Sequence, residues 1–148
     1  QDQCDALAKA AVERFGPIDI LVNNAGTLVT IKPFMEVTTE EWMQIMATNT
    51  LGPFNCVKAV FPFMKDKGGK IINISSGTVF EGVAGLPHYI SSKGAVMAFT
   101  RGMARELGVT SIQIPGNASW QMYENLMAEG ELTSRIDIGA KKIFVSQK

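Results

Sequence analysis

The stretch Lys70–Lys93, KIINISSGTVFEGVAGLPHYISSK, decides the fold because it passes from a strand pattern through a loop to a helix. The run Lys70–Ile74 is mostly apolar and favours a buried strand, and the glycine-rich segment Gly77–Gly85 favours a loop. Pro87 suits the first turn of a helix, which we predict from about His88 to Leu107. A strand, a loop and a helix in this order predict one unit of a parallel α/β sheet.

Three polar side chains of this stretch point to proton transfer. Ser76 follows the predicted strand, and the carboxyl ends of parallel strands are where α/β proteins bind ligands. Tyr89 and Lys93 lie four residues apart and therefore share one face of the predicted helix. A hydroxyl, a phenol and an ammonium that converge on one oxygen atom can move a proton on and off a carbonyl or an alcohol. His88, the only histidine, borders Tyr89 and is interpreted as a pocket-edge residue and not as a base.

The segments before this stretch predict two further helices and one more strand. Residues Asp2–Phe15 have apolar positions at helical spacing, and Ile18–Val22 is a short apolar strand of the kind buried in a parallel sheet. Thr38 and Glu41 form the pattern of a capping box for a long helix, Glu40 to about Lys65. Such an order predicts parallel strands joined by right-handed crossovers.

Two polar patterns in these segments have more than one interpretation. Asn23-Asn24-Ala25-Gly26 follows a predicted strand. Its small residues would let a ligand come close, and its amides could join loops by hydrogen bonds. An ordinary strand-to-loop turn explains the same four residues. Pro53 lacks an N–H, so the carbonyl of Asn49 is free to hold a water. A kinked packing helix explains the same proline without any such role.

Composition places the chain among single-domain globular proteins. Its 148 residues are 46 % hydrophobic and 19 % charged, and 14 basic residues balance 14 acidic ones. This balance, without a basic run, argues against nucleic acid and anionic membrane as partners. The sequence has no apolar run of membrane-spanning length, no signal peptide and no metal-ligand spacing, so no metal is expected. Cys4 and Cys56 form no motif, which favours a reducing, cytoplasmic setting.

With these residues described, the chain resembles the short-chain dehydrogenase/reductase family of NAD(P)-dependent oxidoreductases. The resemblance rests on Asn23–Gly26 after a strand, Asn49 in the next long helix, Ser76 at a strand end, and Tyr89-x-x-x-Lys93. It implies an α/β fold, namely a partial Rossmann-type, doubly wound parallel sheet of about three strands with flanking helices.

The resemblance implies a role for each matching residue. Tyr89 is then the general acid/base at the substrate oxygen, and Ser76 orients that oxygen. Lys93 holds the nicotinamide ribose and helps to ionise Tyr89, and Asn49 positions a water that passes protons to solvent. The cofactor is NAD or NADP, the substrate is a small-molecule alcohol or ketone, and the two long helices form the interface of a homo-oligomer. The residues implied at the cofactor are Asn23, Ala25, Gly26, Tyr89, Lys93, Pro115 and Gly116.

The chain departs from the family pattern on both sides of this site. It contains no strand followed by the glycine-rich turn that binds the cofactor pyrophosphate at a helix N-terminus. A third strand is predicted at Ser111–Ile114, but Ile114 meets Pro115 directly, so several residues of the family pattern are absent there. The resemblance therefore covers roughly Asp2 to Ile114.

These departures lead to predictions about organisation and activity. Residues 1–116 are expected to form a partial NAD(P)-binding domain, and residues 117–148 a divergent tail with a short helix near Ala118–Ala128. The strand Ile18–Val22 then has an open edge, which invites pairing or aggregation. The chain is expected to be a truncated fragment that is weakly active or inactive. The alternative is a non-catalytic oligomerisation module; a sugar-nucleotide epimerase or dehydratase is disfavoured by the Asn-Asn-Ala-Gly stretch.

Overall fold

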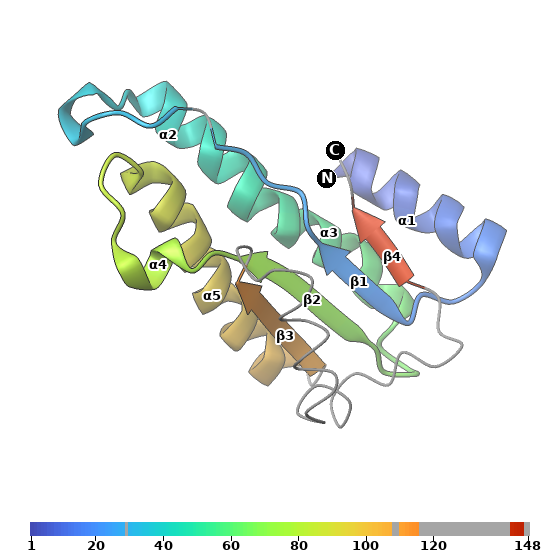
Figure 1. Cartoon of the computed structure of the whole chain (residues 1–148). Helices are drawn as coiled ribbons and strands as arrows, with labels where there is room; N and C mark the ends of the chain where they lie inside the picture. Colours follow the sequence, from blue (N-terminus) through green and yellow to red (C-terminus); the bar gives the residue numbers. More distant parts are fainter. Residues whose placement is uncertain (29, 108–109, 116–142, 147–148) are drawn as a thin grey trace.

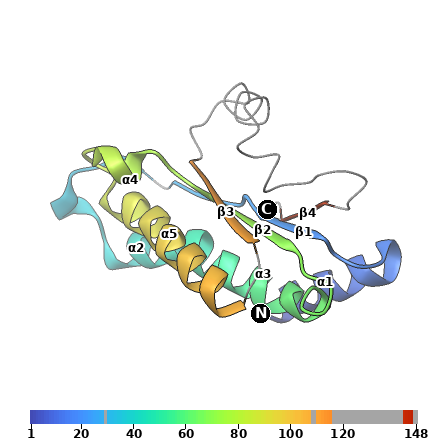
Figure 2. The same ribbon diagram turned by 90° about the horizontal axis from the view of Figure 1, so that it is seen from below.

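The protein is built on a four-stranded parallel sheet, seen in a computed structural model that describes residues 1–28, 30–107, 110–115 and 143–146 (Figure 1). The strand order is β3-β2-β1-β4. In the view from below, the long helices α1, α3 and α5 lie together on one face of this sheet (Figure 2). The predicted partial Rossmann-type α/β sheet is confirmed, with one strand more than expected. The strands are β1 (Ile20–Asn23), β2 (Lys70–Ser75), β3 (Thr110–Pro115) and β4 (Ile143–Ser146).

The two central strands form because their apolar residues are enclosed on both faces. Leu21 of β1 pairs with Ile71 of β2, and neither side chain is exposed. Compared with the predicted bounds, β1 begins two residues later, and β2 continues one residue further, to Ser75. The parallel register places Asn23 beside Asn73, so both strands reach the same edge of the sheet.

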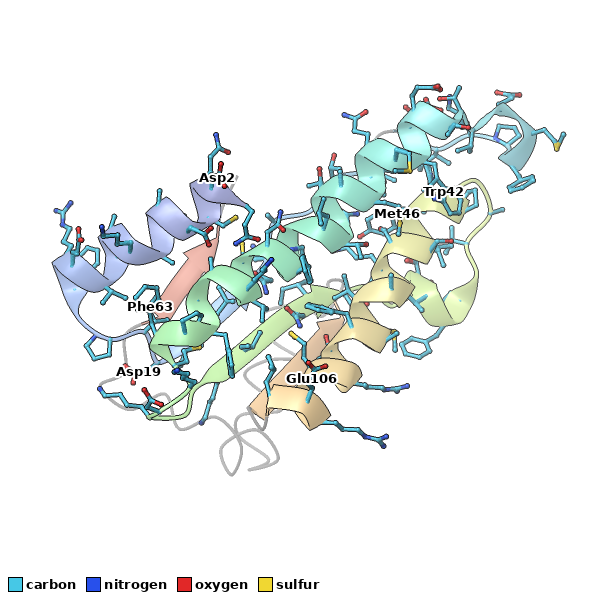
Figure 3. The ribbon with its side chains drawn as sticks, turned by 180° about the vertical axis from the view of Figure 1, so that it is seen from behind. Asp2, Asp19, Trp42, Met46, Phe63 and Glu106 are labelled. Atoms are coloured by element: carbon cyan, nitrogen blue, oxygen red, sulfur yellow. The ribbon has the colours of Figure 1, made fainter. Side chains whose placement is uncertain are left out.

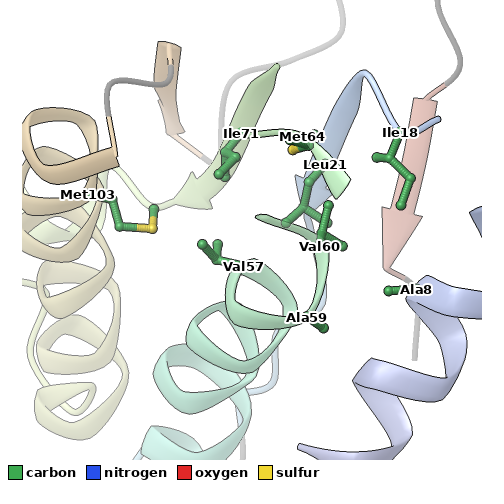
Figure 4. Close-up of a cluster of buried hydrophobic side chains, with 9 residues drawn as sticks. All are labelled: Ala8, Ile18, Leu21, Val57, Ala59, Val60, Met64, Ile71 and Met103. Carbon is green, nitrogen blue, oxygen red and sulfur yellow. The ribbon is translucent and has the colours of Figure 1, made fainter. Parts of the chain in front are cut away.

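The main hydrophobic core lies between the sheet and the helices on its covered face (Figure 4). Helix α1 spans the predicted residues Asp2–Phe15. Helix α5 spans Pro87–Leu107, one residue longer than predicted. Each large apolar side chain buried here contributes roughly 1.5–3 kcal/mol to folding. The core residues are Ala8, Ile18, Leu21, Val57, Ala59, Val60, Met64, Ile71 and Met103.

The long helix predicted from Glu40 to about Lys65 is divided into several pieces. Because Pro53 has no N–H to donate, the helical ladder is interrupted, and the N–H of Gly52 bonds the carbonyl of Ala47 in a wider, π-helical turn. No helix in the described part of the chain is both long and apolar enough to cross a bilayer. The pieces are α2 (Thr39–Met46), the π-helical turn Ala47–Leu51, α3 (Gly52–Val60) and a 3₁₀ turn Phe61–Phe63.

The predicted capping box at the start of α2 is confirmed. The Thr38 hydroxyl accepts a hydrogen bond from the Glu41 N–H at 3.2 Å, and the Glu41 carboxylate accepts one from the Thr38 N–H at 2.9 Å. Glu41 also pairs with Lys32 at 2.6 Å, and this hydrogen-bonded ammonium lowers the pKa of Glu41. Seen from behind, Trp42 and Met46 project from α2 toward α5 (Figure 3). The cap therefore fixes the start of α2 to the preceding loop.

The glycine-rich segment Gly77–Gly85, predicted as a loop, contains one short helix. Helix α4 spans Thr78–Glu81, and Gly82, with a φ of 66°, ends it in the left-handed region. Gly85 also has a positive φ of 79°, and its carbonyl accepts a hydrogen bond from the Lys32 N–H at 3.1 Å. The segment after β2 is thereby tied to the segment after β1.

Strand β4 covers the outer edge of β1, so the prediction of an open edge there is wrong. Ile20–Asn23 pairs in parallel with Ile143–Ser146. The apolar residues Ile143 and Val145, which lie in the segment expected to be a divergent tail, thus belong to the sheet. Strand pairing over such a sequence separation depends on tertiary folding, and local pattern cannot show it. The helix predicted near Ala118–Ala128 lies outside the described residues.

Candidate active site

The carboxyl edge of the sheet gathers most of the residues that the sequence singles out. Asn23 ends β1, and Ala25 and Gly26 follow it; Ser75 ends β2, and Ser76 follows it. The first turn of α5 and the kink between α2 and α3 lie near this edge (Figure 1). Polar groups from four separate segments meet here because parallel strands end together.

Asn49, in the π-helical turn, holds the loop after β1. Its side chain is 1 % exposed; its Oδ1 accepts from the N–H of Thr27 at 2.8 Å, and its Nδ2 donates to the Thr27 carbonyl at 3.0 Å. Nδ2 also donates to the Ser92 hydroxyl at 3.0 Å, which itself donates to the carbonyl of Tyr89 at 2.7 Å. The amide thus connects this loop to the first turn of α5. The implied water at the backbone carbonyl of Asn49 stays a prediction.

Lys93 is a buried cation anchored to the end of β2. It is 4 % exposed, and its Nζ donates to the carbonyl of Ile74 at 3.0 Å. Its own backbone carbonyl accepts from the Ser75 hydroxyl at 2.9 Å. Burial lowers the pKa of the Lys93 ammonium, because little water remains to stabilise the charge. Its Nζ lies 5.9 Å from the centre of the Tyr89 ring, which places charge and phenol in one neighbourhood.

Gly26 lies directly beside this ammonium. A Cβ at Gly26 would stand 3.2 Å from the Nζ of Lys93 and 3.6 Å from the Oδ1 of Asn49. Gly26 is also exposed, so the backbone passes close to Lys93 on one side and faces solvent on the other. The arrangement leaves room for a ligand to approach the ammonium over a residue without a side chain.

Ser76 and Tyr89 occupy the two segments that flank Lys93. Ser76 is 5 % exposed, and its Oγ lies 2.9 Å from the hydroxyl oxygen of Thr78 and accepts from the Thr78 N–H at 3.3 Å. Tyr89 is half-buried in the first turn of α5. The described contacts join Tyr89 to Lys93, and Ser76 to Thr78. Convergence of all three side chains on one oxygen atom stays a prediction.

Asn23 is tied into the interior of the sheet. Its Nδ2 donates to the Oδ1 of Asn73 at 2.8 Å, and the Nδ2 of Asn73 donates to the Thr100 hydroxyl at 2.9 Å. Its own Oδ1 is buried without a hydrogen-bond partner among the described residues. Asn23 and Ala25 also line a pocket of about 240 Å³ that α1 and α3 share with the end of β1. A place for either residue at the cofactor stays a prediction.

The remaining predicted residues have different outcomes. Pro115 ends β3 opposite Ser75 in the register, and Gly116 lies outside the described residues. His88 is fully buried, and neither ring nitrogen has a hydrogen-bond partner within the described part of the chain. The prediction of a pocket-edge histidine is therefore wrong. One position along a helix rotates a side chain by about 100°, which turns His88 inward from the direction of Tyr89.

Sequence reasoning missed three polar residues that organise this edge. Ser92 carries the hydrogen bond between Asn49 and Tyr89, and its spacing of three residues from Tyr89 was the available signal. Thr78 contacts Ser76 from two residues away, as serine and threonine often do in turns. Asn73 is a polar residue within an apolar strand, and an amide buried there requires hydrogen-bond partners.

A parallel sheet with this polar cluster at its carboxyl edge defines an α/β protein of the Rossmann type. A family model described as short chain dehydrogenase matches residues 1–126 of the sequence. The chain therefore belongs to the short chain dehydrogenase family.

Similar proteins are known by sequence and by structure. A 3-oxoacyl-[acyl-carrier-protein] reductase of Synechocystis sp. is 38 % identical over 134 residues, which cover 86 % of this chain and 53 % of the relative. Gluconate 5-dehydrogenase of Gluconobacter oxydans is 40 % identical over 130 residues, or 84 % of this chain and 50 % of the relative. A crystal structure titled short-chain dehydrogenase/reductase SDR:glucose/ribitol dehydrogenase, from Brucella melitensis, has a TM-score of 0.67 and 32 % identity, with 74 % and 46 % coverage. The chain thus spans about half the length of these relatives.

Proposed function

We propose that this chain carries the proton-transfer part of an NAD(P)-dependent oxidoreductase that interconverts an alcohol and a ketone. One observation carries the proposal: the buried ammonium of Lys93 lies beside Gly26 and within 5.9 Å of the Tyr89 ring centre. No carboxylate of the described residues pairs with this ammonium; a buried lysine of this kind is costly, and such groups cluster at functional sites. The relatives named as a reductase and as dehydrogenases support the same chemistry. We place this site in a unit formed by residues 1–116, with residues 117–148 as a tail whose strand β4 pairs with β1.

In this proposal Tyr89 exchanges a proton with the substrate oxygen. The ammonium of Lys93 and the helix N-terminus at Pro87 both bring positive charge to the neighbourhood of Tyr89, where it would stabilise negative charge that develops on an oxygen during the proton exchange. Because Lys93 is almost fully buried, its charge acts in a medium of low dielectric, where it is more effective than in water.

Ser76 and Asn49 position the groups around Tyr89. Ser76 would donate its hydroxyl proton to the substrate oxygen, and its contact with Thr78 restricts the directions that the hydroxyl can take. Asn49 holds Thr27 and, through Ser92, the backbone of Tyr89, so its side chain is satisfied within the protein. A water at its backbone carbonyl would pass protons to solvent.

The residues present fit the nicotinamide end of the cofactor. Gly26 leaves space over Lys93, and the Lys93 ammonium could donate to ribose hydroxyls. The bound cofactor would supply hydride transfer, and the residues described above would supply orientation and the proton. The described residues include no strand followed by the glycine-rich turn that would bind the pyrophosphate, so we propose weak dinucleotide binding by this chain alone.

Two measurements test the proposal. Reduced nicotinamide consumption is followed with a 3-oxoacyl thioester as the ketone, and NADH or NADPH binding is followed by fluorescence titration. We expect slow turnover that is lost in Tyr89→Phe and unchanged in Ser91→Ala, which alters an exposed residue of the same helix. Circular dichroism confirms that each variant is folded. Turnover that survives Tyr89→Phe contradicts the catalytic role, and micromolar cofactor binding contradicts the weak-binding part.

A second candidate function is an oligomerisation module, and one surface favours it. A groove of about 310 Å³ runs between α3 and α5, and the rings of Phe54 and Phe99 lie 6.3 Å apart beside it. Phe54 is exposed although it is large and apolar, and exposed apolar grooves often mark interaction sites. We propose that a second copy of the chain covers this groove, whether the chain acts as an enzyme or as an oligomerisation module. We also propose that the protein is cytoplasmic.

Sedimentation tests the self-association. Phe54→Ser should shift the chain toward monomer, whereas Phe15→Ser, which removes a comparably exposed phenylalanine from α1, should leave its size unchanged. Equal effects of both substitutions contradict the groove as the interface. Association without turnover in the parent or in Tyr89→Phe favours the module over the enzyme.

A further inference from the structure

Two cysteines that are far apart in the sequence lie side by side in the fold. The Sγ atoms of Cys4 and Cys56 are 3.9 Å apart, although 52 residues separate them. Cys4 is in the first turn of α1, and Cys56 is in the middle of α3. Their spacing carried no motif, and only the packing of α1 against α3 reveals the pair.

The pair is accessible from solvent. Both cysteines are partly exposed, and both line the pocket of about 240 Å³ between α1, α3 and the end of β1. Gln1, just before α1, also reaches toward α3, where its side-chain amide lies 3.5 Å from the carbonyl of Asn55. Small reagents can therefore enter the pocket and reach two sulfur atoms that the fold already holds together.

We propose that Cys4 and Cys56 form a redox modification site that takes small disulfides and closes to an intramolecular disulfide. The thiolate of one cysteine attacks a sulfur of the small disulfide, which releases one small thiol and leaves a mixed disulfide. The other cysteine then attacks the protein sulfur of that bond and releases the second small thiol. The two protein sulfurs are oxidised by two electrons, and the small disulfide is reduced to two thiols.

The geometry requires only a local adjustment. A disulfide has sulfur atoms about 2.0 Å apart, so the present 3.9 Å must shorten by side-chain rotation and a small shift of α1 against α3. The bond would fix α1 to the helix that follows the Asn49 turn. It would also enclose β1 and Asn49 in one covalent loop, which limits the unfolded chain and raises the melting temperature.

The site can be tested with oxidised glutathione and intact-mass measurement, independently of any catalytic activity. We expect the native chain to lose two hydrogen atoms in mass, to lose both titratable thiols and to retain no glutathione. The single variants Cys4→Ser and Cys56→Ser lack the second thiol, so each should instead retain one glutathione. The oxidised parent should melt several degrees higher than the reduced parent, and reductant should reverse this shift.

A comparison with the unfolded chain isolates the contribution of the fold. In urea the two thiols are no longer neighbours, so closure after the first exchange should slow by at least about tenfold. A parent that accumulates stable glutathione adducts as the single variants do, or that closes equally fast in urea, overturns the proposal. Covalent dimers in place of the internal bond overturn it as well.

Discussion

At the scale of single residues, Lys93 is the most unusual feature of the molecule. It combines near-complete burial with contacts to a backbone carbonyl and to the face of Tyr89, and no described carboxylate balances its charge. Burial of this kind lowers stability while the ammonium is charged. We therefore interpret Lys93 as a residue retained for the chemistry of the site and not for folding.

We expect Lys93→Met to abolish turnover without lowering the free energy of unfolding. Because the folded pKa of Lys93 lies below 10.5, the unfolded chain binds more protons between these two values, and stability should rise as the pH rises toward 10.5. The variant should lack that rise, which urea unfolding across alkaline pH would measure. Lys58→Met, at an exposed position on α3, should keep it. A large loss of stability in Lys93→Met would mean that the side chain is structural.

Gly85 provides a second prediction at this scale. Its φ of 79° disfavours any side chain, and a Cβ there would meet the Cγ2 of Ile31 at 2.8 Å. Gly85→Ala should lower the free energy of unfolding by about 1–2 kcal/mol. Gly102→Ala, in an open position of α5, should raise it by about 0.5–1 kcal/mol. Thermal or urea unfolding of both variants checks the opposite signs, and a neutral Gly85→Ala would contradict the argument.

At the scale of elements, one chain of buried hydrogen bonds joins β1, β2 and α5. Asn23 donates to Asn73, Asn73 donates to Thr100, and the Thr100 hydroxyl donates to the carbonyl of Val96 at 2.7 Å. These groups are almost completely buried, so each depends on the next for its hydrogen bonds. The chain fixes how the strand ends sit relative to the helix that carries Tyr89 and Lys93.

Asn73→Ala should therefore be strongly destabilising. It leaves the Asn23 side-chain N–H without its acceptor and removes the donor to the Thr100 hydroxyl oxygen, both in the interior, and we expect a loss of about 3 kcal/mol in the free energy of unfolding. Asn24→Ala, next to Asn23 but exposed, should change stability by less than about 0.5 kcal/mol. Urea unfolding distinguishes the two, and equal losses would show that burial of the network is not the cause.

At the scale of the whole molecule, β4 closes an edge that the central strands would otherwise expose. The backbone of Ile20–Asn23 pairs with β2 on one side and with β4 on the other. Unpaired edges next to apolar strands promote association between chains. Strand β4 thus helps to prevent β1 from pairing with a second chain.

A chain that ends before Ile143 should associate more strongly than the parent. Removal of β4 exposes the N–H and C=O groups along β1, which can then pair with a second chain. Light scattering and sedimentation at several concentrations would measure the change. A chain that ends after Ser146 keeps the strand and should behave as the parent does. If the shorter chain associates no more strongly than this control, the edge is protected by something other than β4.

The sequence by itself determined the elements and the candidate residues. The apolar strand patterns, the Thr38 and Glu41 capping box, and the prolines at helix starts act over a few residues, so local physics fixes them. The spacing of four residues between Tyr89 and Lys93 is equally local, so the sequence alone predicts that both lie on one face of a helix. The prediction for His88 was wrong because the residues next to it in the sequence do not reveal which face of α5 the rest of the fold covers.

Only the tertiary structure decided which distant groups meet. The pairing of β4 with β1, the contact of Cys4 with Cys56 and the network from Asn23 to Thr100 each join residues many positions apart. These contacts depend on how the sheet and its helices pack, and packing is a property of the whole chain. Burial of Lys93, from which the chemistry of the site is argued, arises in the same way, because three separate segments must enclose its ammonium together.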